Sequence, residues 1–477
     1  MSLRPQKTKI VATIGPACDA PAILEQMIRA GMSVARLNFS HGTFDEHASR
    51  IERLRTAAKA VGREIALMAD LPGPKMRIGQ LAEEPIQIAS GGMFTLTSQD
   101  VVGDAGRASM TFAGLPQVVQ PGDKLFLNDG IIQLEVERVE GPEVHCRVLT
   151  GGELRSRKGL NLPGIDLGIS AFTERDRECL KFALDHGVDA VSQSFVESAA
   201  DVQAVRETAR SFGGDPFVLA KIERSRALER VDEILAAADG IMVARGDLGV
   251  EVPIEHIAIL QKTLVRKATH LGKPVIIATQ MLESMTHSRQ PTRAEATDVA
   301  NAVLDGTDCV MLSGESATGD FPVEAVATLS RITAATEPHR LRADLCERLK
   351  TLPRGIEYST ADLLSLSVEA VIAASSPAVV VVPTRSGTTA RAIARFRLPV
   401  WIVAPTGCDN VVRHLQFSYG VEPVWMGELP AEWTKFTRDW VLAEALPGPV
   451  ALLVQGPSPA DPHANHRMEI LQLHRLP

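Results

Sequence analysis

Polar side chains that could do chemistry gather where predicted strands end. In the run 34–42, Arg36, Asn38 and Ser40 occupy alternate positions, and alternate residues of a strand share one face. An arginine, an amide and a hydroxyl at one strand end could hold a phosphate and a cation. The alternative is a barrel interior in which these groups only satisfy one another.

A second group combines one basic and two acidic side chains. Lys221 and Glu223 alternate at the end of one predicted strand, and Asp247 follows the end of the next. Two carboxylates suit a hard divalent ion such as Mg²⁺, which keeps other positions for water and substrate. Gly246 would let the backbone approach a ligand closely. The alternative is that Lys221 and Glu223 form only a structural ion pair.

Thr279, at a further strand end, places a hydroxyl where a proton could be transferred, although an ordinary threonine at a barrel mouth would look the same. The chain has neither G-x-x-x-x-G-K-[ST] nor the glycine loop of protein kinases, so the common nucleotide motifs are missing. The residue types and spacing alone predict a metal-dependent barrel enzyme that acts on a phosphorylated acid.

Short β-branched runs, alternating with amphipathic stretches, would position these residues. The predicted helices include 21–30, 45–61 and 174–186. Eight strands separated by helices are typical of either a closed β/α barrel or a doubly wound sheet. The eight predicted strands are Ile10–Ile14, Val34–Asn38, Ile65–Ala69, Ala190–Phe195, Val218–Glu223, Gly240–Ala244, Val275–Thr279 and Cys309–Leu312.

The stretch 73–166 breaks this rhythm, because glycine and proline punctuate short alternating runs. It predicts a small all-β domain inserted after the third strand, where it would cover the active-site face of a barrel. The flanking segments 1–72 and 167–336 are assigned to the catalytic domain. A linker is expected after about Thr336, and 355–477 returns to α/β alternation, which predicts a third domain with an open sheet.

Composition excludes several classes of protein. With 477 residues, of which 45% are hydrophobic and 23% charged, the chain is typical of a soluble protein of two or three domains. A net charge of −8 argues against a nucleic-acid partner. The six cysteines are scattered without a C-x-x-C pattern, and no signal core or membrane-spanning stretch is evident. We therefore expect a cytoplasmic enzyme with no membrane partner.

Several longer motifs resemble those of pyruvate kinases, in matching order across essentially the whole chain. The matching stretches are 8–16, 36–42, 158–164, 221–223, 244–251, 278–285, 291–295 and 311–315. The resemblance implies a (β/α)8 TIM barrel with an inserted small β-barrel lid domain and a C-terminal open-sheet α/β allosteric domain. It also implies the last step of glycolysis, in which phosphoenolpyruvate and ADP give pyruvate and ATP.

Residue roles follow from the resemblance where positions match. Arg36 resembles the arginine that binds the transferring phosphoryl group, and Lys221 the lysine that stabilises charge on that group and on the forming enolate. Glu223 and Asp247 resemble the ligands of Mg²⁺ or Mn²⁺. The backbone amides of Gly246 and Asp247 would hold the substrate carboxylate.

The remaining implied roles concern the proton and the nucleotide. Thr279 resembles the residue that binds substrate and helps to deliver a proton to enolpyruvate. Arg77, His41 and Lys158 resemble contacts to the phosphates of ADP or ATP. The family also implies a homotetramer.

One motif departs from the K⁺-dependent members of this family. Those enzymes hold K⁺ with residues like Asn38, Ser40 and Asp70, and with the backbone carbonyl after the aspartate, which belongs here to Leu71. They carry glutamate where this chain has Lys75, and members that work without K⁺ have lysine there. The Lys75 ammonium could supply the charge that K⁺ otherwise brings, so we expect K⁺ not to be required. A solvent-facing lysine with no such role is the alternative.

A loop in the C-terminal segment predicts an effector site. Hydroxyls, a glycine and an arginine at a strand-to-helix turn suit a phosphate, although many such loops only cap a helix. In pyruvate kinases the matching loop holds the phosphate of an allosteric sugar phosphate, so we expect a phosphorylated-metabolite effector. The other half of the pocket, near 456–465, departs from the better-known forms and leaves the effector open. The loop residues are Thr384, Arg385, Ser386, Gly387, Thr388 and Thr389.

Two other functions would fit part of this pattern. A metal-dependent aldolase acting on a related keto acid also uses paired Glu and Asp at strand ends, but it would not need the Arg36 motif, the lid or the C-terminal domain. A non-enzymatic metabolite sensor would not need Lys221, Glu223, Asp247 and Thr279 to be intact.

Overall fold

Eight parallel strands close into a barrel in the computed structural model, which describes residues 3–340, 359–456 and 465–473. Their order around the ring is β1-β16-β15-β14-β13-β12-β3-β2, which confirms the (β/α)8 barrel and excludes a doubly wound sheet. The strands are almost wholly buried, as expected where helices cover a parallel sheet. They are β1 (Lys9–Thr13), β2 (Met32–Asn38), β3 (Ala66–Leu71), β12 (Ala190–Gln193), β13 (Phe217–Ile222), β14 (Gly240–Ala244), β15 (Val275–Ala278) and β16 (Cys309–Leu312).

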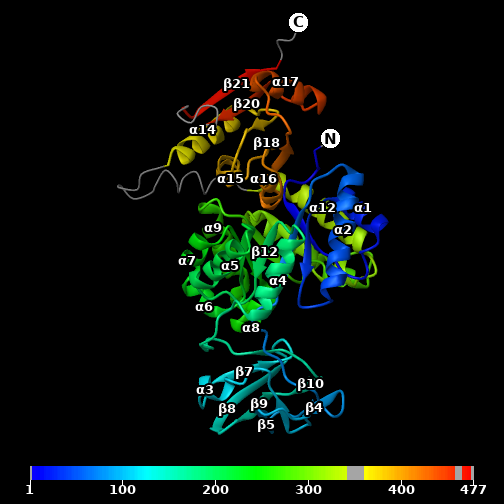
Figure 1. Cartoon of the computed structure of the whole chain (residues 1–477), viewed down its shortest axis with the longest axis vertical. Helices are drawn as coiled ribbons and strands as arrows, with labels where there is room; N and C mark the ends of the chain where they lie inside the picture. Colours follow the sequence, from blue (N-terminus) through cyan, green and yellow to red (C-terminus); the bar gives the residue numbers. More distant parts are fainter. Residues whose placement is uncertain (1–2, 341–358, 457–464, 474–477) are drawn as a thin grey trace.

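Helices surround the barrel (Figure 1). Four of them begin at capping boxes, on Thr43, Thr173, Ser198 and Thr292, so local sequence fixes where these helices start. Among the described helices, none combines the length and the apolar character needed to cross a bilayer. The barrel helices are α1 (Pro21–Ala30), α2 (Phe44–Val61), α4 (Glu174–Asp185), α5 (Ala199–Ser211), α6 (Ser225–Glu229), α7 (Val231–Ala237), α8 (Arg245–Glu251), α9 (Ile257–His270), α10 (Arg293–Asp305), α11 (Gly314–Ala317) and α12 (Pro322–Thr336).

Four barrel strands, β1, β12, β13 and β15, stop one or two residues before their predicted ends. Phe195 and Thr279, predicted as the last residues of two of them, have φ angles of 57° and 67°. These values lie in the left-handed region, which a strand does not accommodate. Glu223 directly follows β13. The polar side chains at this rim therefore belong partly to strand ends and partly to the loops that follow.

The segment between β3 and α4 forms a separate all-β domain, seen below the barrel in Figure 1. Its strands pair as a six-stranded sheet, β11-β7-β8-β9-β5-β6, and a two-stranded sheet, β10-β4. Isolated bridges outside these strands, such as Arg77–Gly159 and Ile78–Met110, add further backbone pairing. The expected small barrel is therefore not closed by one continuous hydrogen-bond ladder. Several of its strands span only two or three residues. A short helix that the sequence did not predict, α3 (Leu115–Val118), is also present. The strands are β4 (Ile86–Ile88), β5 (Met93–Thr97), β6 (Arg107–Ser109), β7 (Lys124–Leu127), β8 (Ile132–Glu140), β9 (Glu143–Thr150), β10 (Gly152–Leu154) and β11 (Leu160–Asn161).

The C-terminal domain is an open five-stranded sheet of order β19-β18-β17-β20-β21, in which only β21 is antiparallel to its neighbour. The open sheet agrees with the sequence prediction. Much of the predicted linker, 341–358, and most of the second half of the effector pocket, 457–464, lie outside the described residues. The elements are α14 (Thr360–Ser375), β17 (Val380–Val381), α15 (Thr388–Ala394), β18 (Ile402–Thr406), α16 (Asp409–His414), β19 (Val421–Trp425), α17 (Trp433–Ala443), β20 (Val450–Gln455) and β21 (Arg467–Gln472).

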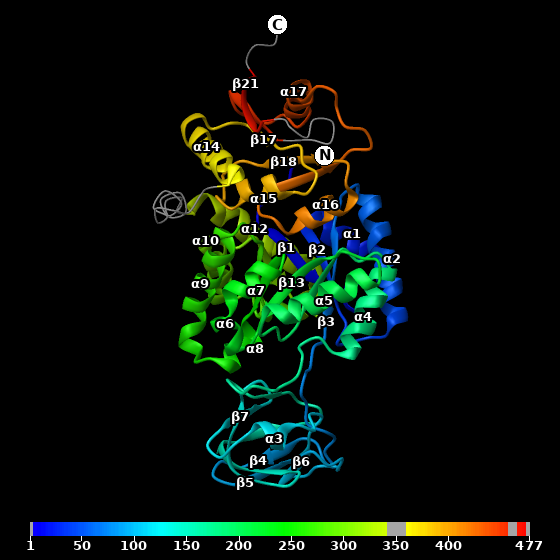
Figure 2. The ribbon, with the colours of Figure 1, turned by 60° about the vertical axis from the view of Figure 1, so that its left-hand side comes forward.

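The C-terminal domain packs against the end of the barrel where the strands begin. Arg397 Nη2 lies 2.5 Å from Asp308 Oδ2, just before β16. Lys9 Nζ, at the start of β1, donates to the backbone oxygen of Val421 at 2.6 Å. The opposite end faces the inserted β domain (Figure 2). The carboxyl ends of the strands, where β/α barrels carry their active sites, therefore lie between the barrel and that domain.

Candidate active site

Asp70, near the end of β3, joins a basic side chain from the adjacent strand β2 and another from β13, which lies beyond β12. Its Oδ2 accepts a hydrogen bond from Arg36 Nε at 2.7 Å, and a shorter one from Arg36 Nη2. Its Oδ1 lies 3.2 Å from Lys221 Nζ and accepts from Ser192 Oγ at 3.0 Å. The parallel register brings these groups together, because Asp70 pairs with Asn38 of β2 and with Ser192 of β12. Arg36 and Lys221 are thereby fixed side by side at the rim.

Lys221 also contacts the acidic residue predicted beside it. Its Nζ lies 3.0 Å from Glu223 Oε1 and donates to Ser194 Oγ at 2.6 Å. Glu223 Oε2 accepts from the backbone amide of Phe195 at 2.8 Å. Glu223 is 1% exposed and Lys221 is 9% exposed, so water screens this pair weakly.

Burial and neighbouring charges set the ionisation of this cluster. Burial alone would lower the pKa of Lys221, but the carboxylates of Asp70 and Glu223 raise it above its ordinary value. Burial opposes the charge on Asp70, yet Arg36 and Lys221 hold its pKa below the usual range. Burial, together with the negative charge of Asp247, raises the pKa of Glu223, and Lys221 opposes that rise. Lys221 is therefore held as a cation.

Thr279 and Gly246 meet across the ends of β15 and β14. Thr279 Oγ1 accepts from the Gly246 amide at 2.8 Å and donates to the Ala278 carbonyl at 2.6 Å. The Arg245 guanidinium holds the carbonyls of Thr279 at 2.8 Å and Ala278 at 3.2 Å, and it pairs with Asp298 at 2.7 Å. The positive φ angle of Thr279 is thus supported by the hydrogen bonds of an arginine.

Asp247, in the first turn of α8, lines a narrow cavity between the barrel and the β domain, together with Lys75, Phe195 and Arg224. Within the described ranges, no three His, Cys, Asp or Glu side chains gather as a metal site. A divalent ion here would thus have the two carboxylates of Glu223 and Asp247 and take further oxygen ligands from substrate and water, as Mg²⁺ commonly does. Burial and then the charge of Asp247 raise the Glu223 pKa, and a bound divalent ion would stabilise the ionised carboxylates.

Basic residues from the barrel and from the β domain surround His41. Burial lowers the pKa of His41, and the charges of Arg77, Lys75 and Arg36 lower it further. Arg77 Nη1 donates to the Arg157 carbonyl at 2.9 Å. The neighbouring segment carries Lys158, whose carbonyl accepts from the Ile78 amide at 2.9 Å. The charges of Arg36, Lys75 and Arg77 around His41 form a region that would attract phosphate groups.

The side chains predicted to hold K⁺ already have hydrogen-bond partners in the protein at Asn38 and Asp70. Asn38 Oδ1 accepts from the Ser40 amide at 3.1 Å. The carboxylate of Asp70 forms ion pairs with Arg36 and Lys221. Leu71 is buried at the end of β3, whereas Lys75 is exposed on the loop beyond it. Lys75 thus lies on the rim near Asp247 and His41.

Sequence reasoning missed three residues at this rim. Ser192 in β12 binds Asp70, and Ser194, directly after that strand, binds Lys221; their period-two spacing was the available signal. Arg245 stands directly before the predicted Gly246 and supports Thr279. Its partner Asp298 lies on α10, far along the chain, so no local pattern reveals it.

The predicted effector loop turns tightly at the start of α15. Gly387 has a φ of 78°, and its amide donates to Thr384 Oγ1 at 2.9 Å. The hydroxyls of Ser386 and Thr388 lie 2.9 Å apart, and Arg391 Nη2 donates to the Ser386 carbonyl at 2.9 Å. Arg385 and Ser386 are exposed, and Thr389 is half-buried. The loop presents hydroxyls and an arginine to solvent.

Comparison with known proteins agrees with this geometry. A family model described as pyruvate kinase, barrel domain, matches residues 5–326, and a second, pyruvate kinase, alpha/beta domain, matches 363–447. A pyruvate kinase of Thermococcus litoralis is 47% identical over 438 residues, 90% of each chain. One from Geobacillus stearothermophilus is 42% identical over 87% of this chain and 71% of its own.

A solved structure is also similar. The crystal structure of a pyruvate kinase from Cryptosporidium parvum superposes with a TM-score of 0.91 at 34% identity, over 98% of this chain and 96% of that one. The barrel, the inserted β domain and the C-terminal sheet thus match a solved protein of this activity over nearly the whole chain. The chain belongs to the pyruvate kinase family and is a phosphotransferase.

Proposed function

We propose that Arg36 and Lys221 are the cations that bind the phosphoryl group as it passes from phosphoenolpyruvate to ADP. The observation that carries this assignment is that Asp70 holds the two side chains together at the rim, with Lys221 kept charged by Asp70 and Glu223. Phosphoryl transfer spreads charge over peripheral oxygens, so fixed cations stabilise the transition state without reorganisation.

Glu223 and Asp247 are proposed to hold Mg²⁺ or Mn²⁺. Both stand at adjacent strand ends beside Lys221, and the mutual repulsion of their carboxylates favours a bound cation. When bound, the ion would neutralise charge on the phosphoryl oxygens. The amides of Gly246 and Asp247 would orient the substrate carboxylate at the start of α8.

Thr279 is proposed to bind substrate and to help deliver the proton to the enolpyruvate carbon. Its hydroxyl donates to the Ala278 carbonyl and accepts from Gly246, so the substrate carboxylate would compete with Thr279 for the Gly246 amide. The freed hydroxyl could then turn toward substrate. The phosphates of the nucleotide would be bound by Arg77, His41 and Lys158.

Steady-state kinetics test these assignments through Lys221→Met. ADP-dependent formation of pyruvate should fall by a factor of about 10² or more in kcat. Lys267→Met is the matched control, because Lys267 makes only an exposed ion pair with Asp232 on the outside of the barrel. Wild-type turnover in the Lys221→Met protein would overturn the assignment.

Two finer properties belong to this proposal. Lys75 would replace the charge of K⁺. The exposed position of Lys75 beside Asp247 and His41 supports this role. The K⁺ site would then be at most weak; its residues are Asn38, Ser40, Asp70 and the Leu71 carbonyl. The loop 384–389 would bind the phosphate of an activating metabolite. Its support is the set of exposed hydroxyls and Arg385 at the start of α15.

The same proposal includes the setting of the enzyme. From the family resemblance we infer a cytoplasmic homotetramer, with domains at 1–72 together with 167–336, at 73–166 and at 355–477. The inserted domain would act as a lid, since the cavity at Asp247 is lined from both sides by the barrel and by that domain.

A further inference from the structure

Two segments of the chain connect the inserted β domain to the barrel, and both are bound to the barrel rim. The outgoing segment leaves β3 at Gly73, which has a φ of 65° and whose amide donates to Asp176 Oδ1 at 2.9 Å. Asp176 is fully buried in the first turn of α4. The returning segment, residues 162–168, runs from β11 back toward α4. Because the chain crosses between the two domains only here, these segments determine where the inserted domain rests.

Arg224, on the barrel loop after β13, holds the returning segment. Its Nη2 donates to the carbonyl of Ile165 at 3.1 Å and to that of Leu162 at 3.4 Å. Arg224 is only 3% exposed, so these hydrogen bonds are shielded from water. Two residues further along the same loop, Arg226 Nη2 donates to Asp166 Oδ2 at 2.8 Å. Two arginines of one barrel loop therefore fix the segment through which the chain leaves the inserted domain.

The other side of the Arg224 guanidinium faces two carboxylates. Its Nε lies 3.4 Å from Glu197 Oε1 and 3.6 Å from Glu251 Oε1. Arg224 Nε and Glu251 Oε1 are both buried, and neither has a hydrogen-bond partner among the residues that the structure describes. Buried polar atoms are normally paired, because an unpaired one carries the full cost of its lost hydration. A small shift of the guanidinium toward Glu251 would complete this contact.

Glu251 belongs to the helix that carries part of the proposed active site. It is the last residue of α8, and the first turn of that helix holds Gly246 and Asp247. Glu251 Oε2 accepts from the amide and from the hydroxyl of Ser225, each at 3.2 Å. The seven residues of α8 make only about two turns, so the helix moves as a unit. A displacement of Glu251 would therefore displace Asp247, which lines the same narrow cavity as Arg224.

A turn of the inserted domain also lies against α8. Asn128, Asp129 and Gly130, between β7 and β8, have successive φ angles of 53°, 55° and 87°. A Cβ atom on Gly130 would lie 3.5 Å from Val250 Cγ1, so the backbone of this turn approaches α8 closely. Asp129 and Asp247 line the same cavity. The inserted domain thus meets α8 directly as well as through the arginine of the barrel loop.

We propose that Arg224 is a positioning residue that couples the position of the inserted domain to α8, and so to Asp247. This inference rests on the proposed role of the inserted domain as a lid. As that domain moves toward the barrel, the guanidinium would follow the two carbonyls that it binds, and its Nε would reach Glu251. A charge-assisted hydrogen bond formed in a buried position is strong. Nucleotide bound by the lid and substrate bound at α8 would therefore favour each other, because such coupling is reciprocal.

Hydrogen exchange of the full chain, followed by mass spectrometry in buffer containing Mg²⁺, tests the coupling. In the wild type, saturating ADP should slow exchange by about fivefold or more in 162–168 and in α8, although no nucleotide contact is assigned to α8. Arg224→Met should abolish the response of α8. Glu251→Gln should abolish most of it too, and it keeps the contacts of Arg224 to the returning segment should Arg224→Met fold poorly.

The outcomes separate this inference from the lid role itself. No response to ADP in either segment of the wild type would refute the lid role, and the coupling with it. A wild-type response confined to 162–168 would leave the lid role standing and refute the coupling. A response of α8 that survives in both Arg224→Met and Glu251→Gln would refute the coupling as well.

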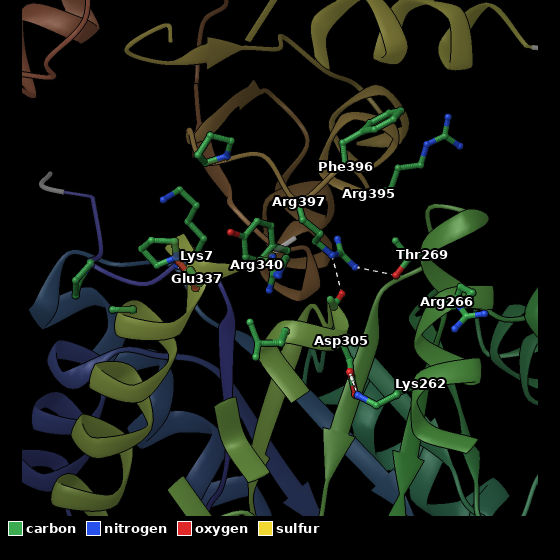
Figure 3. A pocket seen from close by; sticks show the side chains of 17 residues that line it. Lys7, Lys262, Arg266, Thr269, Asp305, Glu337, Arg340, Arg395, Phe396 and Arg397 are labelled. Atoms are coloured by element: carbon green, nitrogen blue, oxygen red, sulfur yellow. Dashed lines mark hydrogen bonds and ion pairs between the residues drawn. The ribbon is translucent and has the colours of Figure 1, made fainter. Parts of the chain in front are cut away.

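Initial rates over a grid of both substrates give a second readout. In the wild type, the apparent KM for phosphoenolpyruvate should fall by about fivefold as ADP rises to saturation, and in Arg224→Met it should stay constant. Arg397→Ala is the control for a general loss of contact between domains. Arg397 joins the C-terminal domain to the other end of the barrel, where its Nη2 donates to Thr269 Oγ1 at 3.3 Å (Figure 3).

Arg397→Ala should lower the thermal midpoint and yet keep both the response of α8 and the dependence of KM on ADP. The same loss of dependence in Arg397→Ala as in Arg224→Met would reduce the effect to a general loosening and contradict the inference. An apparent KM that responds equally to ADP in the wild type and in Arg224→Met would also contradict it.

Discussion

The acidic residue Asp70 determines how Arg36 and Lys221, the two cations proposed to bind the phosphoryl group, are held at the rim. It lies between Arg36 and Lys221 and is 2% exposed, so its negative charge is felt strongly by both. Arg36 and Lys221 would repel each other if they stood side by side without a negative charge. The carboxylate of Asp70 between them offsets this repulsion and keeps both cations at the rim. Asp70 is in this sense a positioning residue.

Replacing Asp70 with asparagine should change the pH profile. Asp70 raises the pKa of Lys221, so its loss should lower that pKa and move the alkaline fall of kcat/KM to lower pH. We expect a fall in kcat/KM of about tenfold or more as well, because a buried charge pair is broken. Ser192→Ala, which removes only one hydrogen bond to Asp70, is the control and should leave the alkaline limb in place. An Asp70→Asn profile that coincides with the wild type would contradict this role.

Lys75 should make the enzyme independent of K⁺. In tetramethylammonium buffer the wild-type enzyme should reach nearly full kcat without added K⁺, because the lysine ammonium supplies the charge. Lys75→Glu should lose activity in that buffer and regain part of it with KCl. Lys59→Glu, at an exposed position near the end of α2, controls for a general change in surface charge. A saturable requirement for K⁺ in the wild type would disprove the replacement.

At the scale of elements, the sequence predicted most of what positions the site. The eight strands and the helices at 21–30, 45–61 and 174–186 were predicted within one or two residues, because hydrophobic periodicity and capping boxes are local. The rim was less predictable. Phe195 and Thr279 leave the strand conformation through positive φ angles, and the Arg245–Asp298 pair joins separate helices. Those features depend on tertiary contacts that no short window contains.

Strand β1 carries a lysine whose charge is disfavoured by the fold. Lys9 is 1% exposed at the interface with the C-terminal domain, and burial lowers its pKa from 10.5 to about 8. The unfolded chain therefore binds more protons than the folded one between these values, so stability should rise as pH increases from about 8 toward 10.5. The shift corresponds to roughly 3 kcal/mol.

Lys9→Met tests this pH dependence. The variant should be more stable relative to the wild type at pH 7 than at pH 10, measured as the difference in thermal midpoint at each pH. The loss of the hydrogen bond to the Val421 carbonyl affects both pH values alike, so the change with pH isolates the proton. Lys435→Met, in an exposed pair with Asp439, should show a pH-independent difference over pH 7–9. A constant difference for Lys9→Met up to pH 10 would refute the assigned pKa.

The loop before α15 is the other element with a separable function. Ser386→Ala/Thr389→Ala removes two hydroxyls while Gly387 keeps its turn through Thr384. Activation by phosphorylated metabolites should decrease at least tenfold in apparent affinity, and turnover without activator should stay within about twofold. Initial rates over a series of sugar phosphates measure both quantities. Undiminished activation would exclude the loop as the effector site.

At the scale of the whole molecule, the barrel separates two ends with different tasks. The end where the strands finish faces the inserted β domain and carries the proposed active site, and the end where the strands begin carries the C-terminal domain (Figure 2). Family resemblance anticipated this order of domains. It did not reveal that arginines, among them Arg397 and Arg413, reach from the C-terminal domain to barrel carboxylates, since these partners are distant in sequence.

Arg397→Ala should loosen the C-terminal domain from the barrel. Its guanidinium pairs with Asp308 at 2.5 and 3.0 Å, and its Nε donates to the Gly306 carbonyl at 2.7 Å. The side chains of Arg397 and Asp308 are 7% and 4% exposed, so removal of one partner leaves a buried carboxylate and should cost about 3 kcal/mol. Because the contact joins two domains, calorimetry should show an earlier unfolding transition for the C-terminal domain. Lys435→Ala, which breaks only an exposed ion pair, should leave the unfolding transitions at their wild-type temperatures. A single transition at the wild-type temperature in Arg397→Ala would mean that the remaining contacts, including Lys9 with Val421, hold the domains together without it.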